Sequence, residues 1–348
     1  MINYRDHLIL TQATIKEALI RFDKLGRDAI LFVTDHDDRL IGSLTDGDVR
    51  RGLIKGVSID HPINDIIRPD PRFIKKGEQD IQKIIDYREQ NYRIIPIIDQ
   101  QERIIDVINF REIRSYLPLD AVIMAGGRGQ RLKPLTDFTP KPLLKVGDKP
   151  IIEHNIDRLS AFGITDFWIS VNYLGKQIEQ YFGDGSGRNV KFSYVWEDKP
   201  LGTIGAVSQI SNFSHQYVLV TNSDLLTNLD YEHFFLDFLQ QDADLSVLTI
   251  PYQVNIPYAV LETSNGHVLN FVEKPTYTYY SNGGIYLMKR EILNCLPRDT
   301  FYNTTDLMEK LIADGKKVVS HPLVGYWLDI GNSNDFEKAQ EDIKSLKF

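Results

Sequence analysis

Short apolar runs and amphipathic stretches alternate through the last two thirds of the chain. The runs at residues 121–124, 167–171, 190–195 and 217–220 are short enough to be buried strands, and 175–182 has helical spacing. Alternation of this kind predicts an α/β sheet with helices on both faces. In such sheets ligands bind beyond the carboxyl ends of the strands.

The first third contains an internal repeat at an offset of 64 residues. Residues 31–42 align with 95–106, and each copy predicts a strand, a charged turn and a second strand. A helix with an acidic start is expected after each, at 48–53 and 112–117, and amphipathic helices at 15–20 and 81–86 precede them. Each copy is too small to bury its own sheet, so we expect the two to pack together.

A proline-bearing junction at residues 115–120 separates the repeat from the rest of the chain. We expect one domain at 1–118, with copies at about 5–60 and 65–118, and a second at 119–348. The junction is short and stiff rather than a flexible linker.

Composition excludes some classes of partner. The 348 residues, 42% hydrophobic and 25% charged, are typical of a soluble globular protein. A net charge of −8 argues against nucleic acid or an anionic membrane as the main partner. The single cysteine, Cys295, rules out an intrachain disulfide. Without a signal peptide or an apolar run of about 18 residues, we expect a cytoplasmic protein.

A glycine-rich loop follows the apolar run at 121–124. Its residues are Ala125, Gly126, Gly127, Arg128 and Gly129, followed by Gln130, Arg131 and Lys133. Glycine N–H groups form an anion nest, and the cationic side chains can reach a polyphosphate. The loop lacks the Gly-Lys-Ser/Thr ending of a Walker loop and the glycine spacing of dinucleotide-binding folds. By itself it is equally compatible with a tight turn.

Other chemical groups follow later strands. Lys141 lies between two prolines, and Glu197, Gly202 and Thr203 belong to a second glycine-bearing turn. Asp224 follows the apolar run at 217–220, and Asp329 precedes a glycine. Two carboxylates together with bound phosphates suit Mg²⁺. Either aspartate alone is more often a turn former or a helix cap.

The repeat resembles a tandem pair of CBS domains over roughly residues 5–118. In that family a Thr/Ser followed three residues later by Asp binds the ribose of an adenine nucleotide, which implies Thr45 and Asp48 here. The second copy departs, with Asn109 and Glu112 at those positions. A regulatory adenine or guanine nucleotide is one expectation, and a packing module that binds nothing is the other.

Residues 119–348 resemble the sugar-1-phosphate nucleotidylyltransferases, which implies a Rossmann-like mixed sheet of GT-A type. The resemblance rests on six ordered elements, at 125–136, 140–142, 200–206, 273–275, 282–286 and 327–331. It implies that a sugar 1-phosphate attacks the α-phosphorus of a nucleoside triphosphate and releases pyrophosphate. No protein nucleophile is needed, so catalysis comes from positioning and charge neutralisation.

The resemblance also implies a role for each matched residue. Arg131 and the loop N–H groups would bind the β- and γ-phosphates, and Lys141 the α-phosphate. Asp224 and Asp329 would hold Mg²⁺. The sugar and its phosphate would be bound by a further set, which consists of Asn222, Glu273, Lys274, Asn282 and Gly283.

Base and sugar preference are less constrained. The Glu197 carboxylate can accept two hydrogen bonds from guanine N1–H and N2–H₂, which favours GTP, although a solvated acidic turn is equally compatible. A CBS pair in front of this domain resembles the glucosamine-1-phosphate guanylyltransferases of legionaminic acid synthesis. Mannose-1-phosphate guanylyltransferase and glucose-1-phosphate thymidylyl- or uridylyltransferase remain alternatives, and so does a nucleotide-sensing regulator without activity. We expect a homo-oligomer.

Overall fold

The computed structural model describes residues 3–77 and 80–346. The chain divides into two compact units, Met1–Pro118 and Leu119–Phe348, called here the N-terminal and C-terminal units.

The N-terminal unit contains two three-stranded sheets of the same topology. In each, the first strand pairs parallel with the second, and the second pairs antiparallel with the third. Both antiparallel pairs have a register shift at the corresponding place, Val33/Thr34 and Ile97/Ile98. The elements are β1 (Leu8–Leu10), α1 (Ile15–Leu25), β2 (Ile30–Thr34), β3 (Leu40–Thr45) and α2 (Asp46–Ile54), then β4 (Ile74–Lys75), α3 (Ile81–Glu89), β5 (Ile94–Ile98) and β6 (Ile104–Asn109). The repeat predicted from the sequence is therefore a structural repeat.

The two copies share a hydrophobic core, as expected. Leu8 and Phe32 of the first copy pack with Ile94, Ile98 and Ile104 of the second. The charged turns also meet, because Leu40 N–H donates to the Glu102 carbonyl and Ile104 N–H donates to the Asp38 carbonyl. Each sheet thus buries a face that it could not bury alone.

The helix predicted at 112–117 is wrong, because these residues form turns and irregular structure. Asn109 begins a turn by accepting hydrogen bonds from the N–H groups of Glu112 and Ile113. Pro118 then disfavours helical backbone at the residue before it, so too few residues remain for a helix.

A seven-stranded mixed sheet forms the centre of the C-terminal unit, with the order β11-β10-β7-β12-β17-β14-β18. The first four strands are parallel, and β17 runs antiparallel to both β12 and β14. The strands are β7 (Leu119–Met124), β10 (Asp166–Val171), β11 (Lys191–Trp196), β12 (Tyr217–Asn222), β14 (Leu245–Asn255), β17 (Thr276–Lys289) and β18 (Val318–Pro322). This confirms the predicted α/β fold and its four predicted strands.

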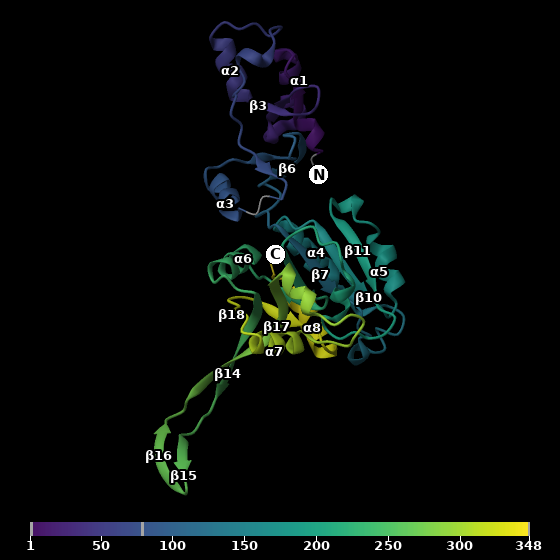
Figure 1. Cartoon of the computed structure of the whole chain (residues 1–348), viewed down its shortest axis with the longest axis vertical. Helices are drawn as coiled ribbons and strands as arrows, with labels where there is room; N and C mark the ends of the chain where they lie inside the picture. The colour runs from purple at the N-terminus through teal and green to yellow at the C-terminus, as the bar shows by residue number, and fades with distance from the viewer. Residues whose placement is uncertain (1–2, 78–79, 347–348) are drawn as a thin grey trace. The chain divides into compact units, whose positions relative to one another are not determined.

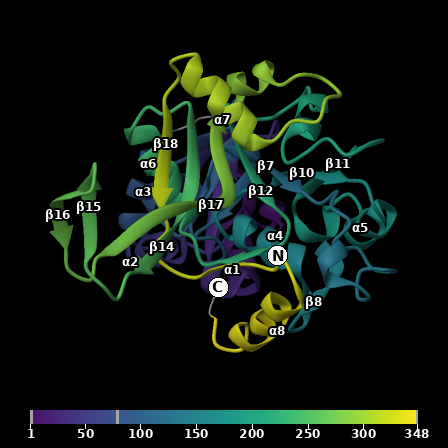
Figure 2. The same ribbon diagram turned by 90° about the horizontal axis from the view of Figure 1, so that it is seen from below.

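Helices lie on either side of this sheet, with α7 on one side and α4 and α8 on the other (Figure 2). Leu307 and Leu311 of α7 belong to one core cluster with Val122, Val220 and Met288 of the strands. The helices are α4 (Ile151–Ala161), α5 (Gly175–Phe182), α6 (Tyr231–Gln240), α7 (Thr304–Ala313) and α8 (Ser333–Asp342). The predicted helix at 175–182 is confirmed. Among the described residues, no helix has both the length and the apolarity needed to cross a bilayer.

Three two-stranded sheets complete the unit. They are β8 (Lys145–Val146) with β9 (Lys149–Pro150), β13 (Leu225–Thr227) with β19 (Trp327–Asp329), and β15 (Val260–Ser264) with β16 (His267–Val272). The β15–β16 hairpin is carried at the tip of a long ribbon, formed by the outer halves of β14 and β17, that extends beyond the sheet (Figure 1).

Asp120 is a fully buried carboxylate at the start of the central strand β7. It accepts hydrogen bonds from the backbone N–H groups of Ser214 and His215, at 3.2 and 2.8 Å. Burial raises the pKa of Asp120 above the usual aspartate value, and these N–H groups only partly oppose the shift. The carboxylate therefore ties the loop before β12 to β7 at an electrostatic cost.

We predict that the Asp120→Asn variant gains stability relative to the wild type as pH rises from about 4 to 7. A carboxyl group whose pKa is raised in the folded state stabilises the protein at pH values below its unfolded-state pKa. This contribution is lost as the pH rises through the folded-state pKa. Asparagine does not titrate, so the difference in free energy of unfolding should grow with pH. Urea unfolding at several pH values measures it, and a pH-independent difference would contradict the prediction.

Candidate active site

A cleft of about 710 Å³ opens at the carboxyl ends of the parallel strands of the C-terminal unit. Asn222 ends β12 beside it, and Glu197 and Asn172 directly follow β11 and β10. The predicted residues that line it are Gly126, Gly127, Arg128, Gly129, Arg131, Lys141, Glu197, Gly202, Thr203, Asn222 and Asp224. Ala125 is buried behind the loop.

The glycine loop is packed so tightly that side chains are excluded at two positions. Gly129 has φ +60°, and a Cβ atom there would lie 2.9 Å from the Lys141 Cβ. A Cβ atom on Gly126 would lie 2.6 Å from a carboxylate oxygen of Glu197. Both glycines therefore allow the backbone to approach groups that the sequence predicted to be functional.

Pairing between distant strands brings the two predicted metal ligands together. Leu225 of β13 pairs with Asp329 of β19, and the N–H of Ile330 donates to the carbonyl of Asp224 at 3.0 Å. The ammonium of Lys141, a largely buried residue, contacts the Asp224 carboxylate directly. Lys141 and Asp224 thus line the cleft together, and the Asp329 carboxylate lies close enough to interact electrostatically with both.

The surroundings of Asp329 fit a bound cation. Its Oδ1 atom is buried and has no hydrogen-bond partner among the described residues. Burial and then the neighbouring Asp224 carboxylate raise the pKa of Asp329. A divalent cation between the two carboxylates would satisfy the orphaned oxygen and offset their repulsion.

The protein alone does not complete a metal centre. In residues 3–77 and 80–346, no group of three or more His, Cys, Asp or Glu side chains is placed to hold a metal ion. A cation here would need further oxygen ligands from water or a bound phosphate, as is usual for Mg²⁺.

Two arginines of the glycine loop lie at the mouth of the cleft. The guanidinium of Arg131 lies close to Gly331, whose Cβ position is 3.4 Å from both terminal nitrogens. The Arg128 guanidinium lies 6.0 Å from the ring centre of Tyr173. Both arginines are exposed, so they are accessible to an anionic ligand.

Glu197 is nearly buried and connects three segments around the cleft. One carboxylate oxygen accepts a hydrogen bond from the Ser170 hydroxyl, and the other accepts from Leu201 N–H at 3.1 Å. The carboxylate therefore anchors the Gly202 loop to the end of β10, beneath Gly126. Each carboxylate oxygen retains the capacity to accept a second hydrogen bond, which the predicted role in base recognition requires.

Part of the predicted sugar-binding set lies next to this cleft. A Cβ atom on Gly284 would lie 2.7 Å from the Asn222 amide nitrogen. The Gly283 carbonyl accepts a hydrogen bond from the Trp327 indole, and the Asn282 side chain accepts from Gly284 N–H, both at 2.9 Å. The root of β17 therefore forms one edge of the site.

Glu273 and Lys274 are not brought to the cleft. They connect β16 to β17 at the far end of the ribbon, and both are exposed. Neither side chain makes a hydrogen bond or an ion pair with another residue in the described part of the chain. In the sequence these residues lie between motifs that contribute to the cleft. In the structure the extended ribbon keeps them away from the cleft.

Some residues of the cleft were missed by sequence reasoning. Asn172 lines it and donates a side-chain hydrogen bond to the Glu197 carbonyl. Its position directly after a predicted strand was a usable signal, as it was for Asp224. Phe301 also lines the cleft, and nothing in its local sequence indicated this. The segment after Gly202 forms a short 3₁₀ helix, Gly205–Gln209.

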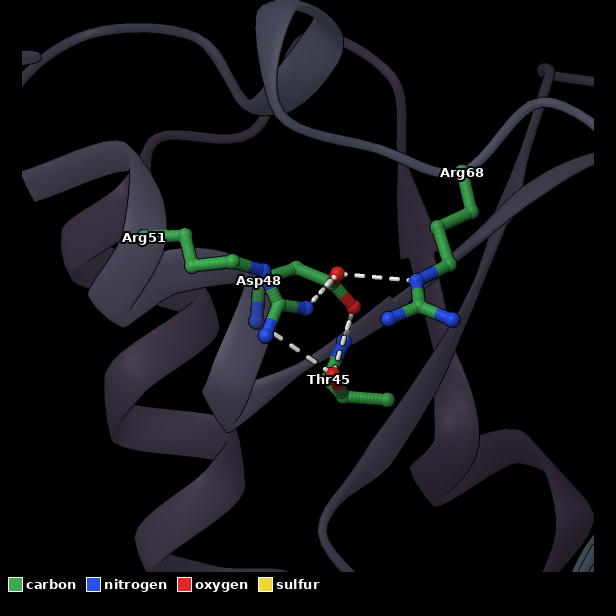
Figure 3. Close-up of polar contacts among 4 residues, drawn as sticks. All are labelled: Thr45, Asp48, Arg51 and Arg68. Carbon is green, nitrogen blue, oxygen red and sulfur yellow. Dashed lines mark hydrogen bonds and ion pairs between the residues drawn. The ribbon is translucent and has the colours of Figure 1, made fainter. Parts of the chain in front are cut away.

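In the N-terminal unit, Thr45 and Asp48 form the capping box of α2. Figure 3 shows Arg51 and Arg68 approaching the same carboxylate from two sides, with Arg68 Nε 2.8 Å from Asp48 Oδ1. Burial alone would raise the pKa of Asp48, but hydrogen bonds from Thr45, Arg68 and Arg51 lower it. Asp48 is thus engaged by its own chain, while the two arginines keep more than half of their side-chain surface exposed.

The corresponding position of the second copy is occupied differently. Asn109 is buried, and its amide lies 3.4 Å from the carboxylate of Asp28, which also pairs with Arg111 at 3.1 Å. In the second copy, Asn109 and Arg111 therefore both contact Asp28, whereas in the first copy two arginines contact Asp48.

Comparison with known proteins agrees with this geometry. The nucleotidyl transferase family model matches residues 120–345, and the CBS domain model matches residues 8–55. Mannose-1-phosphate guanylyltransferase of Mycobacterium tuberculosis is 31% identical, over 65% of this chain and 64% of its own length. D-glycero-alpha-D-manno-heptose 1-phosphate guanylyltransferase of Aneurinibacillus thermoaerophilus is 29% identical, over 65% of this chain and 99% of its own.

A solved structure supports the same assignment. The crystal structure of HddC from Yersinia pseudotuberculosis matches 64% of this chain and 99% of its own, with 28% identity and a TM-score of 0.51. With a family model that covers nearly the whole C-terminal unit, the chain belongs to the nucleotidyl transferase family and has a CBS domain in its N-terminal unit.

Proposed function

We propose that this protein transfers a guanylyl group from GTP to a sugar 1-phosphate, with glucosamine 1-phosphate as the preferred sugar and pyrophosphate as the second product. The observation that carries the proposal is that Lys141 and Asp224 line the cleft with the glycine loop, and that strand pairing brings Asp329 close to both. Relatives that act on mannose 1-phosphate and heptose 1-phosphate support a guanylyltransferase.

The residues of the cleft suit nucleotidyl transfer without a covalent intermediate. A phosphate oxygen of the sugar 1-phosphate attacks the α-phosphorus, and pyrophosphate leaves from the opposite side. The loop N–H groups and Arg131 bind the departing phosphates, and Lys141 neutralises charge at the α-phosphate. Mg²⁺ held by Asp224 and Asp329 supplies further charge neutralisation when bound.

The choice of base rests on Glu197. Guanine presents two donors, N1–H and N2–H₂, on one edge, and the carboxylate has unused acceptor capacity on both oxygens. The choice of sugar rests on the resemblance of the domain order to the glucosamine-1-phosphate guanylyltransferases of legionaminic acid synthesis. Mannose 1-phosphate and a heptose phosphate are the nearest competitors, since few pocket contacts separate them.

We also propose that the N-terminal unit binds a regulatory adenine or guanine nucleotide. The favouring observation is the pair Arg51 and Arg68, which are held together by a single carboxylate and therefore carry net positive charge. Exposed guanidinium groups arranged in this way suit a phosphate.

The test of the main proposal is a pyrophosphate-release assay that crosses GTP, dTTP, UTP, CTP and ATP with glucosamine-, N-acetylglucosamine-, mannose- and glucose 1-phosphate. We expect the fastest turnover with GTP and glucosamine 1-phosphate, and loss of turnover when a chelator removes Mg²⁺. Asp329→Asn serves as the inactive control. Preference for dTTP or UTP would contradict the role of Glu197, and no turnover with any pair would contradict the proposal.

Replacing Glu197 by Gln should selectively reduce the use of GTP. Loss of one acceptor from a bidentate base contact costs about 1–3 kcal/mol, or roughly a 5- to 150-fold fall in kcat/KM for GTP. Because Glu197 also anchors the Gly202 loop, the informative quantity is the ratio of kcat/KM for GTP to that for dTTP. Ser170→Ala, which weakens the anchor alone, is the matched control. Equal losses for both nucleotides would assign Glu197 a purely structural role.

For the regulatory nucleotide, Arg68→Ala should weaken AMP binding by the full chain about 10-fold, the usual effect of losing a charge-assisted hydrogen bond. Arg50→Ala changes an exposed arginine on α2, the helix that carries Arg51, and should leave the affinity unchanged. Isothermal titration measures both. Equal affinities in the two variants, or no AMP binding by the wild type, would refute this role of the N-terminal unit.

A further inference from the structure

The ribbon and hairpin between residues 251 and 282, called here the arm, expose an unusually apolar surface. Its charged residues are only Glu262, Glu273 and Lys274. The exposed large side chains are Tyr252, Tyr258, Leu261, Val268, Leu269, Phe271, Val272, Tyr277, Tyr279 and Tyr280. A contiguous surface of this kind marks a contact with another protein surface rather than a solvated strand pair.

The pairing of β14 with β17 concentrates much of this apolar surface on one face. Tyr252 lies directly opposite Tyr279, and Val254 lies opposite Tyr277. Directly opposed residues project from the same side of an antiparallel pair, and so do residues two apart on one strand. These four side chains therefore form an apolar stripe along the ribbon.

The arm also separates two predicted substrate contacts from their own cleft. Lys274 is nine residues from Gly283, which at about 3.3 Å per residue is roughly 30 Å of strand. A lysine side chain is far too short to span that distance. Lys274 has φ +45°, an unusual conformation for a non-glycine residue, which is consistent with a functional corner.

The strand pairing of the ribbon has no break at which the ribbon could bend back toward its own cleft. Its pairs continue without a register shift from Thr249↔Asn282 to Asn255↔Thr276, and the shift between Val247 and Thr249 lies at its root. Bringing Lys274 to the cleft of its own chain would require several of these pairs to break. The positive-φ residue Gly284 is also at the root, beside Asn222 and the cleft.

We propose that two copies of this chain exchange arms, so that Glu273 and Lys274 of each copy complete the sugar-phosphate side of the other copy's cleft. The inference rests on the proposed function together with the sequence resemblance, which implies that these two residues bind the sugar and its phosphate. A reciprocal exchange satisfies both copies, because each chain carries one arm and one cleft. The apolar stripe is then buried against the partner copy.

Mixing two inactive variants tests the exchange. Lys274→Ala damages only the arm, and Lys141→Ala damages only the cleft. When the two are co-expressed with different tags, a mixed dimer contains one intact cleft served by one intact arm. Turnover should return to about a quarter of the wild-type value, since half of randomly assorted dimers are mixed and each has one working site of two.

A matched control pairs Lys274→Ala with Glu273→Ala. Both changes lie in the arm, so this mixture should stay inactive. An inactive Lys274→Ala and Lys141→Ala mixture, despite mixed dimers isolated through both tags, would show that each arm serves its own chain. Failure to isolate any mixed dimer would equally overturn the exchange.

Oligomeric state tests the exchange independently of activity. By light scattering we expect a wild-type dimer, and a monomer for the double variant Leu261→Ser and Phe271→Ser, with unchanged circular dichroism. A wild-type monomer, or a double variant that remains fully dimeric, would overturn the proposal. If the wild type forms such a dimer but transfers no nucleotide, the proposed function fails while the arm exchange stands.

Discussion

The candidate active site depends on the pairing of β13 with β19. These short strands are separated by about one hundred residues, yet their register places Asp224 and Asp329 side by side. Both carboxylates are half-buried and repel each other, and the pKa of Asp329 is raised first by its burial and then by this repulsion. Lys141 offsets part of it by direct contact with Asp224, and the orphaned oxygen of Asp329 leaves a position suited to a cation.

Glu197 also joins segments that are distant in the sequence, namely the end of β10 and the Gly202 loop. Its carboxylate lies beneath Gly126 and holds both Ser170 and the Leu201 backbone. A side chain on Gly126 would displace the carboxylate, and loss of the carboxylate would free the Gly202 loop. The position of the Gly202 loop and the shape of the cleft beneath Gly126 thus depend on one buried glutamate.

The two units differ in the surroundings of one aspartate each, Asp48 and Asp329. In the N-terminal unit, Asp48 is satisfied by a helix cap and two arginines, so its pKa is lowered and its charge is stabilised. In the C-terminal unit, Asp329 has no such partners and its charge is strained. Around Asp48, two partly exposed guanidinium groups are available to an anion. At Asp329, a carboxylate oxygen without a hydrogen-bond partner in the described residues suits a cation. Opposite electrostatic environments therefore suit the two units to different ligand chemistry.

Local sequence determined much of this protein. Apolar runs and helical spacing identified β7, β10, β11, β12 and α5, because burial in a parallel sheet leaves a local hydrophobic signature. Repetition identified the paired sheets of the N-terminal unit, and strand ends identified most of the residues that line the cleft. The helix at 112–117 was predicted by analogy with the first copy, where the corresponding residues form α2. The prediction was wrong because Pro118 disfavours helical backbone at the residue before it.

Tertiary structure decided what depends on long-range pairing. The approach of Asp329 to Asp224, the anchoring of Glu197 by Ser170 and the contact of Asn109 with Asp28 all join residues far apart in the chain. The arm is the clearest case, since Glu273 and Lys274 stand in motif order with the rest of the site. Only the unbroken β14–β17 ladder places them away from the cleft, because strand pairing is set by partners and not by local composition.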